Sequence, residues 1–515
     1  MNLFKTIPVL LFFLIINPAS AKLLQIIHTN DLHSHFSGEK NGLGGYARVK
    51  TLVDELKSKA LAQKIPTLFL DAGDFGEGSS FFFANKGLDA FKAMDYLGVD
   101  VTVLGNHDYM LGGTELKRHI EESDLKAQVL SANLEGKSSL GLTNLVEDYA
   151  DYYFEGLKVR IVGLSTPEIH FQYPLRPNGK IGDPHKVGIK QAQEAKKDGV
   201  DFFIALTHTG IKSDTILAEK SRSINIIVGG HDHFLFPEPK MIQNLEGDMI
   251  PIVQAGAYGL HVGSIIVDMQ GAGEYKLIDY RVYQVNQDIT ENVDMKKFVD
   301  EAYLNRERYF NRSWNEEIGL SNISLSGQVN GNLVESPSCW SKHLARMTRV
   351  AGETQLGLQI EIFQGDEVPA GKITFGNIIE NFPRFRAWGD RGWSVTTGRV
   401  RGYVLKKILE FLKSGDTPII ATIDGLEAFQ GEGLMPSVFN VNSHDADLAM
   451  VEGNIINNTS FYTLALPSEI PYAIRQLSPF LTDIVFDDQQ NSEKYYWEMM
   501  EDYIRQNSPL NCLNE

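Results

Sequence analysis

The chain has 515 residues, 43% of them hydrophobic and 22% charged, as expected of a globular protein with about two domains. Its formal net charge of -18 at pH 7 disfavours general nucleic-acid binding, because an acidic protein gains nothing from releasing the counterions of a phosphate backbone. A phosphorylated small substrate would need a local cationic site made by metal ions or arginines.

The first residues have the pattern of an export signal. Lys5 gives a short positive segment, residues 7–16 are apolar, and Ala19-Ser20-Ala21 is a cleavage signal. This predicts a signal peptide over residues 1–21; the alternative is a buried N-terminal helix. Because the apolar run is too short to span a bilayer, we expect an exported protein without a membrane span, either periplasmic or secreted.

The chain has two cysteines, Cys339 and Cys512, and neither lies in a motif typical of a catalytic thiol. Export permits a disulfide between them, but their positions in the sequence do not decide whether the two thiols meet.

Apolar strands, polar loops and amphipathic helices alternate from residue 23 onward. Strands are expected at residues 23–27, 67–70, 101–104, 159–164, 202–206, 224–228, 251–253 and 264–267, and early helices at 45–57 and 88–97. This alternation predicts a layered α/β domain.

A polar, helix-compatible segment at residues 292–312 could link this domain to a second one. Beyond it, expected elements lie at residues 343–350, 371–379, 401–412 and 495–503. Their mixture predicts a smaller α+β domain.

Five strands of the first half end in side chains that can bind metal ions. These ends read Thr29-Asn30-Asp31-Leu32-His33, Asp71-Ala72-Gly73-Asp74, Gly105-Asn106-His107-Asp108, Thr207-His208-Thr209 and Gly229-Gly230-His231-Asp232-His233. A single end of this kind is usually a turn. Because ligands gather beyond the carboxyl ends of strands in α/β sheets, five such ends predict one site. Carboxylate, amide and imidazole groups without thiolate suit Zn, Mn or Fe.

The order D-x-H, G-D, G-N-H-D, H, G-H-x-H resembles the binuclear metallophosphoesterase superfamily. The stretches IIHTNDLHSHF, GGYARVKTLVDELK, LSTPE, GGHDH and PIVQAGAYG are similar to its secreted 5'-nucleotidase branch, strongly over residues 23–290 and weakly beyond. The resemblance implies a calcineurin-like, layered β-sandwich domain flanked by helices at 22–290, a linker helix at 291–330 and a 5'-nucleotidase-like α+β substrate domain at 331–515.

The resemblance also implies two divalent metal ions, which could be Zn, Mn, Fe or Co. The first ion would be held by Asp31, His33 and His233, the second by Asn106, His208 and His231, and Asp74 would bridge both.

Beside the metals, His107 would hydrogen-bond the scissile phosphoryl group, and Asp108 could orient His107. The 5'-nucleotidase branch commonly places a catalytic acid a few residues after the histidine, where this chain has Tyr109, Met110 and Leu111.

In the second domain the specificity elements of the branch do not match. A glycine-rich segment that ends in arginine is replaced by IEIFQGDEVPAG, and the two base-stacking aromatics are missing from PIIATIDG and LALPSEIPYAI. Arg384, Arg386 and Arg391 could instead pair with an anionic substrate, with Trp388 or Trp393 as a stacking platform. The alternative is a solvated loop with structural tryptophans.

The function predicted from these features is that of an exported metal-dependent phosphoesterase of the 5'-nucleotidase type. It would hydrolyse small phosphomonoesters, with nucleotides as candidates, by a metal-activated water. One alternative is a sulfate thiohydrolase of thiosulfate oxidation on the same scaffold. Another is a non-catalytic binding protein, although a complete ligand set favours an enzyme.

Overall fold

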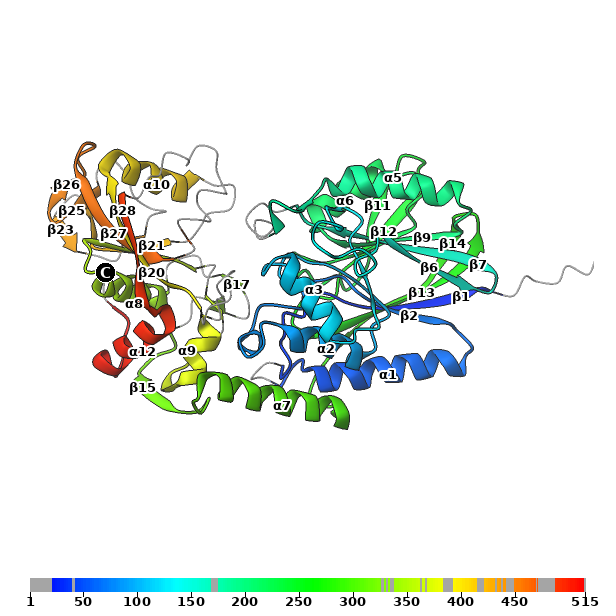
Figure 1. Ribbon diagram of the computed structural model, residues 1–515, viewed down its shortest axis with the longest axis horizontal. Coiled ribbons are helices and arrows are strands. Elements are labelled where there is room, and N and C mark those ends of the chain that lie inside the picture. Colours follow the sequence, from blue (N-terminus) through cyan, green and yellow to red (C-terminus); the bar gives the residue numbers. More distant parts are fainter. Residues whose placement is uncertain are drawn as a thin grey trace, which may run out of the picture.

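The computed structural model describes most of the chain after the predicted signal peptide. The described residues are 21–38, 42–167, 175–325, 328–329, 332–333, 338–361, 364–365, 368–382, 392–414, 421–430, 433–436, 439–440, 449–468, 470 and 487–513. Two lobes lie side by side, and helix α7 (Val293–Phe310) runs along the base from the first lobe to the second (Figure 1).

The first sheet of the first lobe carries three of the five predicted metal-binding strand ends. Its strands, in spatial order, are β14 (Glu274–Gln284), β13 (His261–Gly271), β1 (Leu23–Thr29), β2 (Thr67–Asp71), β3 (Val101–Val103) and β4 (Gln128–Leu130). The strands from β1 to β4 are parallel, whereas β13 is antiparallel to β1. The carboxyl ends of β1, β2 and β3 therefore lie at one edge of the sheet.

The second sheet carries the other two strand ends. Its order is β11 (Lys240–Gln243), β12 (Met249–Val253), β10 (Ile226–Gly229), β9 (Phe202–His208), β7 (Leu157–Ser165) and β6 (Tyr149–Phe154). Strands β7, β9, β10 and β12 are parallel. Strand β3 of the first sheet lies against β7 and β9, so the two sheets stack.

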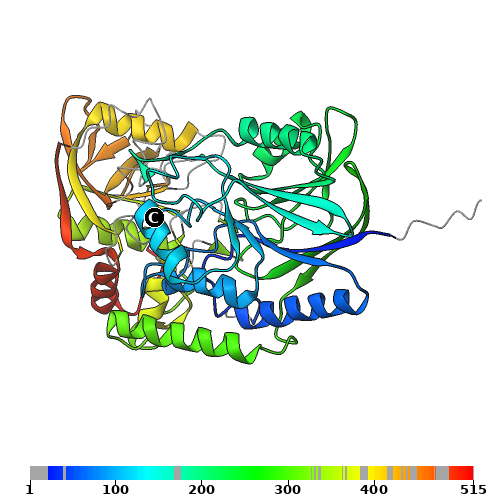
Figure 2. The same ribbon diagram turned by 45° about the vertical axis from the view of Figure 1, so that its right-hand side comes forward.

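The core of the first lobe is the apolar layer between these sheets. Ile26, Leu70 and Val103 of the first sheet meet Ile161 and Leu206 of the second, and all are fully buried. Side chains on the outer faces pack against helices, which explains the nearly continuous apolar strands. The first sheet is covered by α1 (Tyr46–Ala62), α2 (Leu88–Leu97), α3 (Gly113–Glu122) and α7, and the second by α5 (Pro184–Lys197) and α6 (Ile211–Lys220). Figure 2 shows the helices above and below the sheets.

Local sequence signals set several helix boundaries. Helix α2 has the predicted bounds and ends at Gly98, whose φ of 79° is accessible to glycine at little cost. Helix α5 begins with Pro184, and the Asp183 side chain before it accepts hydrogen bonds from the backbone amides of His185 and Lys186.

The second lobe mixes sheets and helices. Its six-stranded sheet is β24 (Phe439–Asn440), β21 (Ala421–Asp424), β18 (Leu356–Ile360), β27 (Phe461–Pro467), β20 (Ser394–Arg401) and β28 (Asp487–Tyr495). A four-stranded sheet is β23 (Gly433–Pro436), β22 (Leu426–Gln430), β25 (Ala449–Val451) and β26 (Asn454–Ile455). The helices are α8 (Cys339–Ala351), α9 (Phe375–Asn381), α10 (Gly402–Ser414) and α12 (Tyr496–Asn507).

Three short strand pairs complete the described structure. They are β5 (Leu134–Glu135) with β8 (Lys180–Ile181), β15 (Glu317–Ser321) with β19 (Gly371–Thr374), and β16 (Gln328–Val329) with β17 (Asn332–Leu333).

Two loops of the first lobe pack into the second. Phe82 and Phe83, at the end of the 3-10 helix η1 (Ser80–Phe82) after β2, belong to the apolar core of the second lobe. Met110 and Leu111, after β3, pack against the same core. The two lobes therefore meet at the loops that carry two of the predicted metal-binding strand ends.

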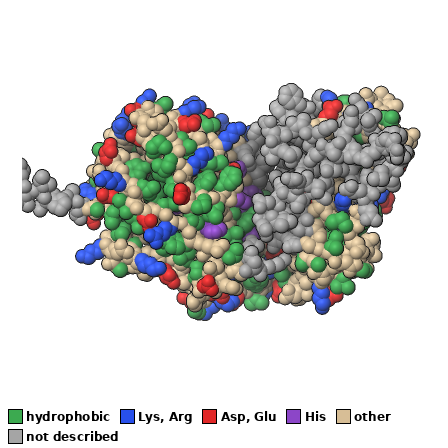
Figure 3. Space-filling model, turned by 180° about the vertical axis from the view of Figure 1, so that it is seen from behind, with side chains coloured by type: hydrophobic (Ala, Val, Ile, Leu, Met, Phe, Trp, Pro, Cys, Tyr) green, Lys and Arg blue, Asp and Glu red, His purple; other side chains and the backbone are tan. Residues whose placement is uncertain are grey.

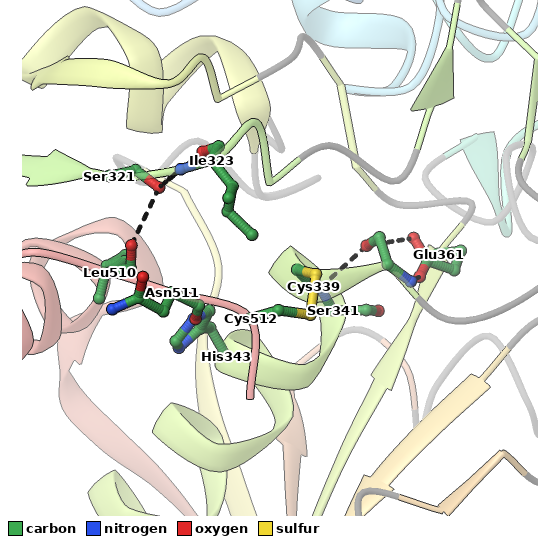
Figure 4. Close-up of a disulfide and its surroundings, with 10 residues drawn as sticks. Ser321, Ile323, Cys339, Ser341, His343, Glu361, Leu510, Asn511 and Cys512 are labelled. Atoms are coloured by element: carbon green, nitrogen blue, oxygen red, sulfur yellow. Dashed lines mark hydrogen bonds between the residues drawn. A yellow bond between two sulfur atoms is a disulfide. The ribbon is translucent and has the colours of Figure 1, made fainter. Parts of the chain in front are cut away.

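A disulfide links Cys339 with Cys512, which settles the pairing that the sequence left open (Figure 4). It joins the start of α8 to the C-terminal segment. Beside it, Nε2 of His343 donates a hydrogen bond of 2.7 Å to the carbonyl of Asn511, so the segment is held by more than one contact.

The predicted α/β architecture with a smaller α+β unit is confirmed. The predicted domain boundaries stay a prediction; within the predicted linker range the described helix spans Val293–Phe310, and β15 already pairs with β19 of the second lobe. Among the residues that the structure describes, no helix is long and apolar enough to cross a membrane.

Candidate metal centre

The five strand ends converge, and the structure brings all seven predicted ligands together. Three groups of three residues offer ligand atoms that all lie within 4.8 Å of one another: Asp31, His33 and His233 in the first, Asp74, His208 and His231 in the second, and His33, Asp74 and His107 in a third that connects them. Asn106 contacts the second group, because its Oδ1 lies 3.2 Å from Nδ1 of His231.

The first group gathers around Asp31 beyond β1. Nε2 of His33 lies 3.1 Å from Nε2 of His233, and Oδ1 of Asp31 lies 3.5 Å from the latter atom. Three donor atoms thus point at one small volume.

Asp74 lies between the two groups. Its Oδ2 is 3.0 Å from Nε2 of His208 and 3.8 Å from Nε2 of His33. This position is the one expected of a carboxylate that bridges two metal ions.

Backbone contacts aim two of the imidazoles. Nδ1 of His33 donates to the carbonyl of Glu77 at 2.5 Å, and Nδ1 of His208 donates to the carbonyl of Ala72 at 2.7 Å. With Nδ1 engaged, the lone pair for a metal is on Nε2, and both Nε2 atoms face the site.

The backbone at the ligands is strained. Positive φ angles, which non-glycine residues rarely adopt, occur at Asp31 (52°), His33 (47°), Asp74 (56°), His231 (89°) and His233 (59°). Such strain concentrates at functional sites, where surrounding structure enforces it. The strand ends are also closely packed, and a side chain has no room at Gly105, where a Cβ would lie 2.1 Å from Oδ1 of Asp74.

The buried carboxylates of this site need positive charge beside them. Burial raises the pKa of Asp31, whose carboxylate also faces Asp74. Burial by itself would lower the pKa of the His208 imidazole, but the carboxylates of Asp74 and Asp31 raise it to about 10. Buried carboxylates are stable only with positive charge beside them, which divalent ions on these donors would supply. The residues therefore fit a binuclear metal site.

His107 adjoins the ligand groups, with its ring centroid 4.8 Å from that of His33, and an acid other than Asp108 contacts it. Nδ1 of His107 donates to Oε2 of Glu77 at 2.5 Å. The Asp108 carboxylate instead accepts hydrogen bonds from the backbone amides of Asp74, Gly76 and Gly105, at 2.7 to 2.9 Å. Asp108 thus ties two loops together and Glu77 contacts the histidine, while an orienting role of Asp108 stays a prediction.

Comparisons with known proteins agree with this geometry. Residues 24–235 match the model of the calcineurin-like phosphoesterase family. The chain is 26% identical to a 5'-nucleotidase of Mus musculus over 432 residues, which cover 76% of this chain and 72% of that one. The chain is thus a phosphoester hydrolase with 5'-nucleotidase homologues.

Solved structures share the fold of this phosphoesterase. A 5'-nucleotidase precursor of Thermus thermophilus superposes with a TM-score of 0.78 at 24% identity, over 96% of this chain and 98% of the other. A sulfate thiohydrolase of the same species reaches 0.72 at 16% identity, over 97% and 96%. Likeness at these identities shows a common architecture and does not favour the thiohydrolase alternative.

The predicted substrate residues of the phosphoesterase, Arg384, Arg386, Trp388 and Arg391, lie outside the described residues. Trp393, the other predicted platform, is described. It is 8% exposed and meets the Phe382 ring edge-on at 5.5 Å in the core of the second lobe, which is the structural role that the sequence left open.

Beside the ligand groups lies an aromatic residue that sequence reasoning did not single out. The Tyr258 ring stacks on His35 with centroids 4.2 Å apart and lies 5.3 Å from the His233 ring. The stretch PIVQAGAYG, which resembles the 5'-nucleotidase branch, contains this tyrosine and was the available signal. Figure 3 shows histidine side chains at the surface on the side of the first lobe that faces the second.

Proposed function

We propose that the protein hydrolyses small phosphomonoesters, nucleoside 5'-monophosphates among them, at a binuclear metal centre at the carboxyl ends of the strands of its two sheets. The observation that carries the proposal is the pair of ligand groups with Asp74 between them. Two metal ions on these donors would polarise a phosphoryl oxygen and lower the pKa of a water to make a nucleophile at neutral pH.

Each predicted residue then has a role in this proposal. One ion is assigned to Asp31, His33 and His233, the other to Asn106, His208 and His231, and Asp74 bridges them. His107 donates a hydrogen bond to the phosphoryl group and stabilises the charge that develops there. In the reaction, the water oxygen bonds to phosphorus as the ester P–O bond breaks, and the leaving oxygen takes up the equivalent of the proton that the attacking water loses.

The cellular location and the further substrate contacts are proposed from the sequence. The signal peptide predicted over residues 1–21 is the basis for proposing export to the periplasm or the medium. Arg384, Arg386, Arg391 and Trp388 are proposed as contacts to the substrate beyond its phosphate.

The test is phosphate release by the mature chain from Lys22. Protein stripped of metal with a chelator is reloaded with Mn²⁺ or Zn²⁺ and given AMP, p-nitrophenyl phosphate, bis-p-nitrophenyl phosphate and a thiosulfonate. We expect about two metal ions per chain, release of phosphate from AMP, and a loss of at least about 10²-fold in the D74N variant.

Metal content decides how a negative result is interpreted. D74N should bind fewer ions, whereas H107A should keep its metals and lose turnover. A wild-type chain that binds two ions but releases phosphate from none of the esters contradicts the proposal, and sulfate release from the thiosulfonate would establish the alternative.

A further inference from the structure

Glu77 is a buried acid that the predicted ligand set does not use. It follows the bridging Asp74 by three residues, is 2% exposed, and its Oε2 accepts the hydrogen bond of 2.5 Å from Nδ1 of His107. Glu77 and His107 come from the ends of two neighbouring strands, β2 and β3, so a contact across the sheet edge joins them.

The backbone of Glu77 is fixed on its other side. Its carbonyl accepts the hydrogen bond from Nδ1 of His33. The next residue, Gly78, has a φ of 151°, and a Cβ there would lie 2.5 Å from Cβ of His33. The side chain of Ser34 donates to the carbonyl of Gly76. The loop that presents the Glu77 carboxylate is therefore held against the ligand loop after β1.

The acid expected within a few residues of His107 is missing. Tyr109, Met110 and Leu111 occupy those positions, and Asp108 is engaged by three backbone amides. The acid that contacts the histidine is supplied by the preceding strand end instead.

We propose that Glu77 is the positioning residue for His107 in catalysis, an inference that rests on the proposed phosphoesterase function. Because Nδ1 is engaged by Glu77, a contact from His107 to the substrate has to come from Nε2. A carboxylate on the far nitrogen fixes the orientation and tautomer of an imidazole and stabilises the positive charge on the ring. In the imidazolium form, which the carboxylate stabilises, Nδ1–H donates to Glu77 and Nε2–H donates to the phosphoryl or leaving oxygen.

The kinetic test is a double-mutant cycle on E77Q and H107A in the metal-loaded chain. Gln keeps the shape and an acceptor oxygen but removes the charge, and the backbone carbonyl that contacts His33 is unchanged. We expect E77Q to lower kcat about 10²-fold or more, with KM and metal content within about threefold of wild type. In the H107A background the change from Glu77 to Gln should lower kcat by less than about threefold. E77D, which keeps the charge, should have a higher kcat than E77Q.

S79A is the matched loop control. It removes the hydrogen bond of 2.8 Å from the Ser79 hydroxyl, in the Glu77 loop, to the carbonyl of Ser34 in the loop after β1, together with the cap of 3.4 Å from the amide of Phe81, without touching His107. Its kcat should stay within about threefold of wild type. If E77Q behaves like S79A, or costs as much in H107A as in the wild type, the inference is overturned.

A spectroscopic readout separates this inference from the proposed function. In protein labelled with ¹⁵N-histidine, the ring signals of His107 are those lost in H107A among the 13 histidines. We expect a protonated Nδ1 with a strongly downfield proton in wild type, moved upfield in E77Q. If these His107 signals are observed in a chain that shows no turnover, the proposed function is contradicted but the contact between Glu77 and His107 is supported. Unchanged His107 signals in E77Q would overturn the inference whatever the activity.

Discussion

The guanidinium of Arg306 lies 2.9 Å from Oε1 of Glu380 and 2.7 Å from the hydroxyl of Ser80. These contacts join three elements: the connecting helix α7, helix α9 of the second lobe, and the loop after β2. Ser80 follows Glu77 by three residues. The loop after β2, whose Glu77 contacts His107, is thus also a loop that contacts the second lobe.

The R306M variant should be strongly destabilised. Arg306 is 1% exposed and also lies over the Trp314 ring at 3.5 Å, so Met can replace its packing but leaves the Glu380 charge without its partner. Removing one member of a buried pair costs about 3 kcal/mol. Urea unfolding should show this loss, and R308M is the control, because exposed Arg308 pairs with Glu301 at the surface and should change stability by less than about 0.5 kcal/mol. Equal losses in the two variants would contradict a buried link.

Asp108 should behave as a clamp between loops. In D108N an NH₂ group replaces one of the two oxygens that accept backbone hydrogen bonds, so at least one buried amide loses its partner, at about 1–3 kcal/mol. Urea unfolding should therefore detect a loss of stability. D232N is the control, since exposed Asp232 accepts from the backbone amide of Ile211. A fall in kcat at unchanged stability would instead support the orienting role predicted for Asp108.

Local signals made much of the fold and the ligand set predictable. Apolar runs that end in Asp, Asn or His mark both the strands and their functional edge, and helix 88–97 was expected with the bounds that α2 has. The partner of His107 gave no such signal. Glu77 stands in a glycine-rich loop that resembles a solvated turn, and only the sheet places it beside a residue 30 positions away.

Contacts between residues far apart in the sequence could not be predicted from it either. Arg306 looks like any cation of a polar helix, and its burial follows from packing of the second lobe. Nothing in the spacing of Cys339 and Cys512 showed that their Cα atoms come within 4.9 Å. The substrate loop at residues 383–391 stays a prediction.

Asp214 should make stability depend on pH. It is fully buried on α6, and burial raises the pKa of its carboxyl from 3.8 to about 7. The native state thus keeps a proton that the unfolded state loses, so this group's contribution to stability falls as pH rises from about 4 to about 7 and is constant above. D214N removes that contribution. The difference in free energy of unfolding between D214N and wild type, measured by urea unfolding, should therefore shift in favour of D214N by up to about 4 kcal/mol between pH 4 and pH 8.

A second variant tests the sign of the Asp214 effect. The hydroxyl of Thr209 donates to Oδ1 of Asp214 at 2.7 Å and so lowers the pKa of that carboxyl. T209V removes this donor and should make the loss of stability toward pH 8 larger than in wild type. Identical pH dependence in wild type, D214N and T209V would exclude a role for this carboxyl.

The disulfide should stabilise the second lobe without serving the reaction. It closes a separation of 173 residues, so its loss should cost about 2–4 kcal/mol, mainly through the greater freedom of the unfolded chain. The native C-terminal segment keeps its other contacts, such as the hydrogen bond of 2.9 Å from the amide of Asn322 to the carbonyl of Leu510. C512S should therefore unfold at a lower temperature with kcat nearly unchanged, and dithiothreitol should lower the Tm of wild type but not of C512S. A Tm that dithiothreitol lowers equally in both would show that the reductant acts elsewhere than on this bond.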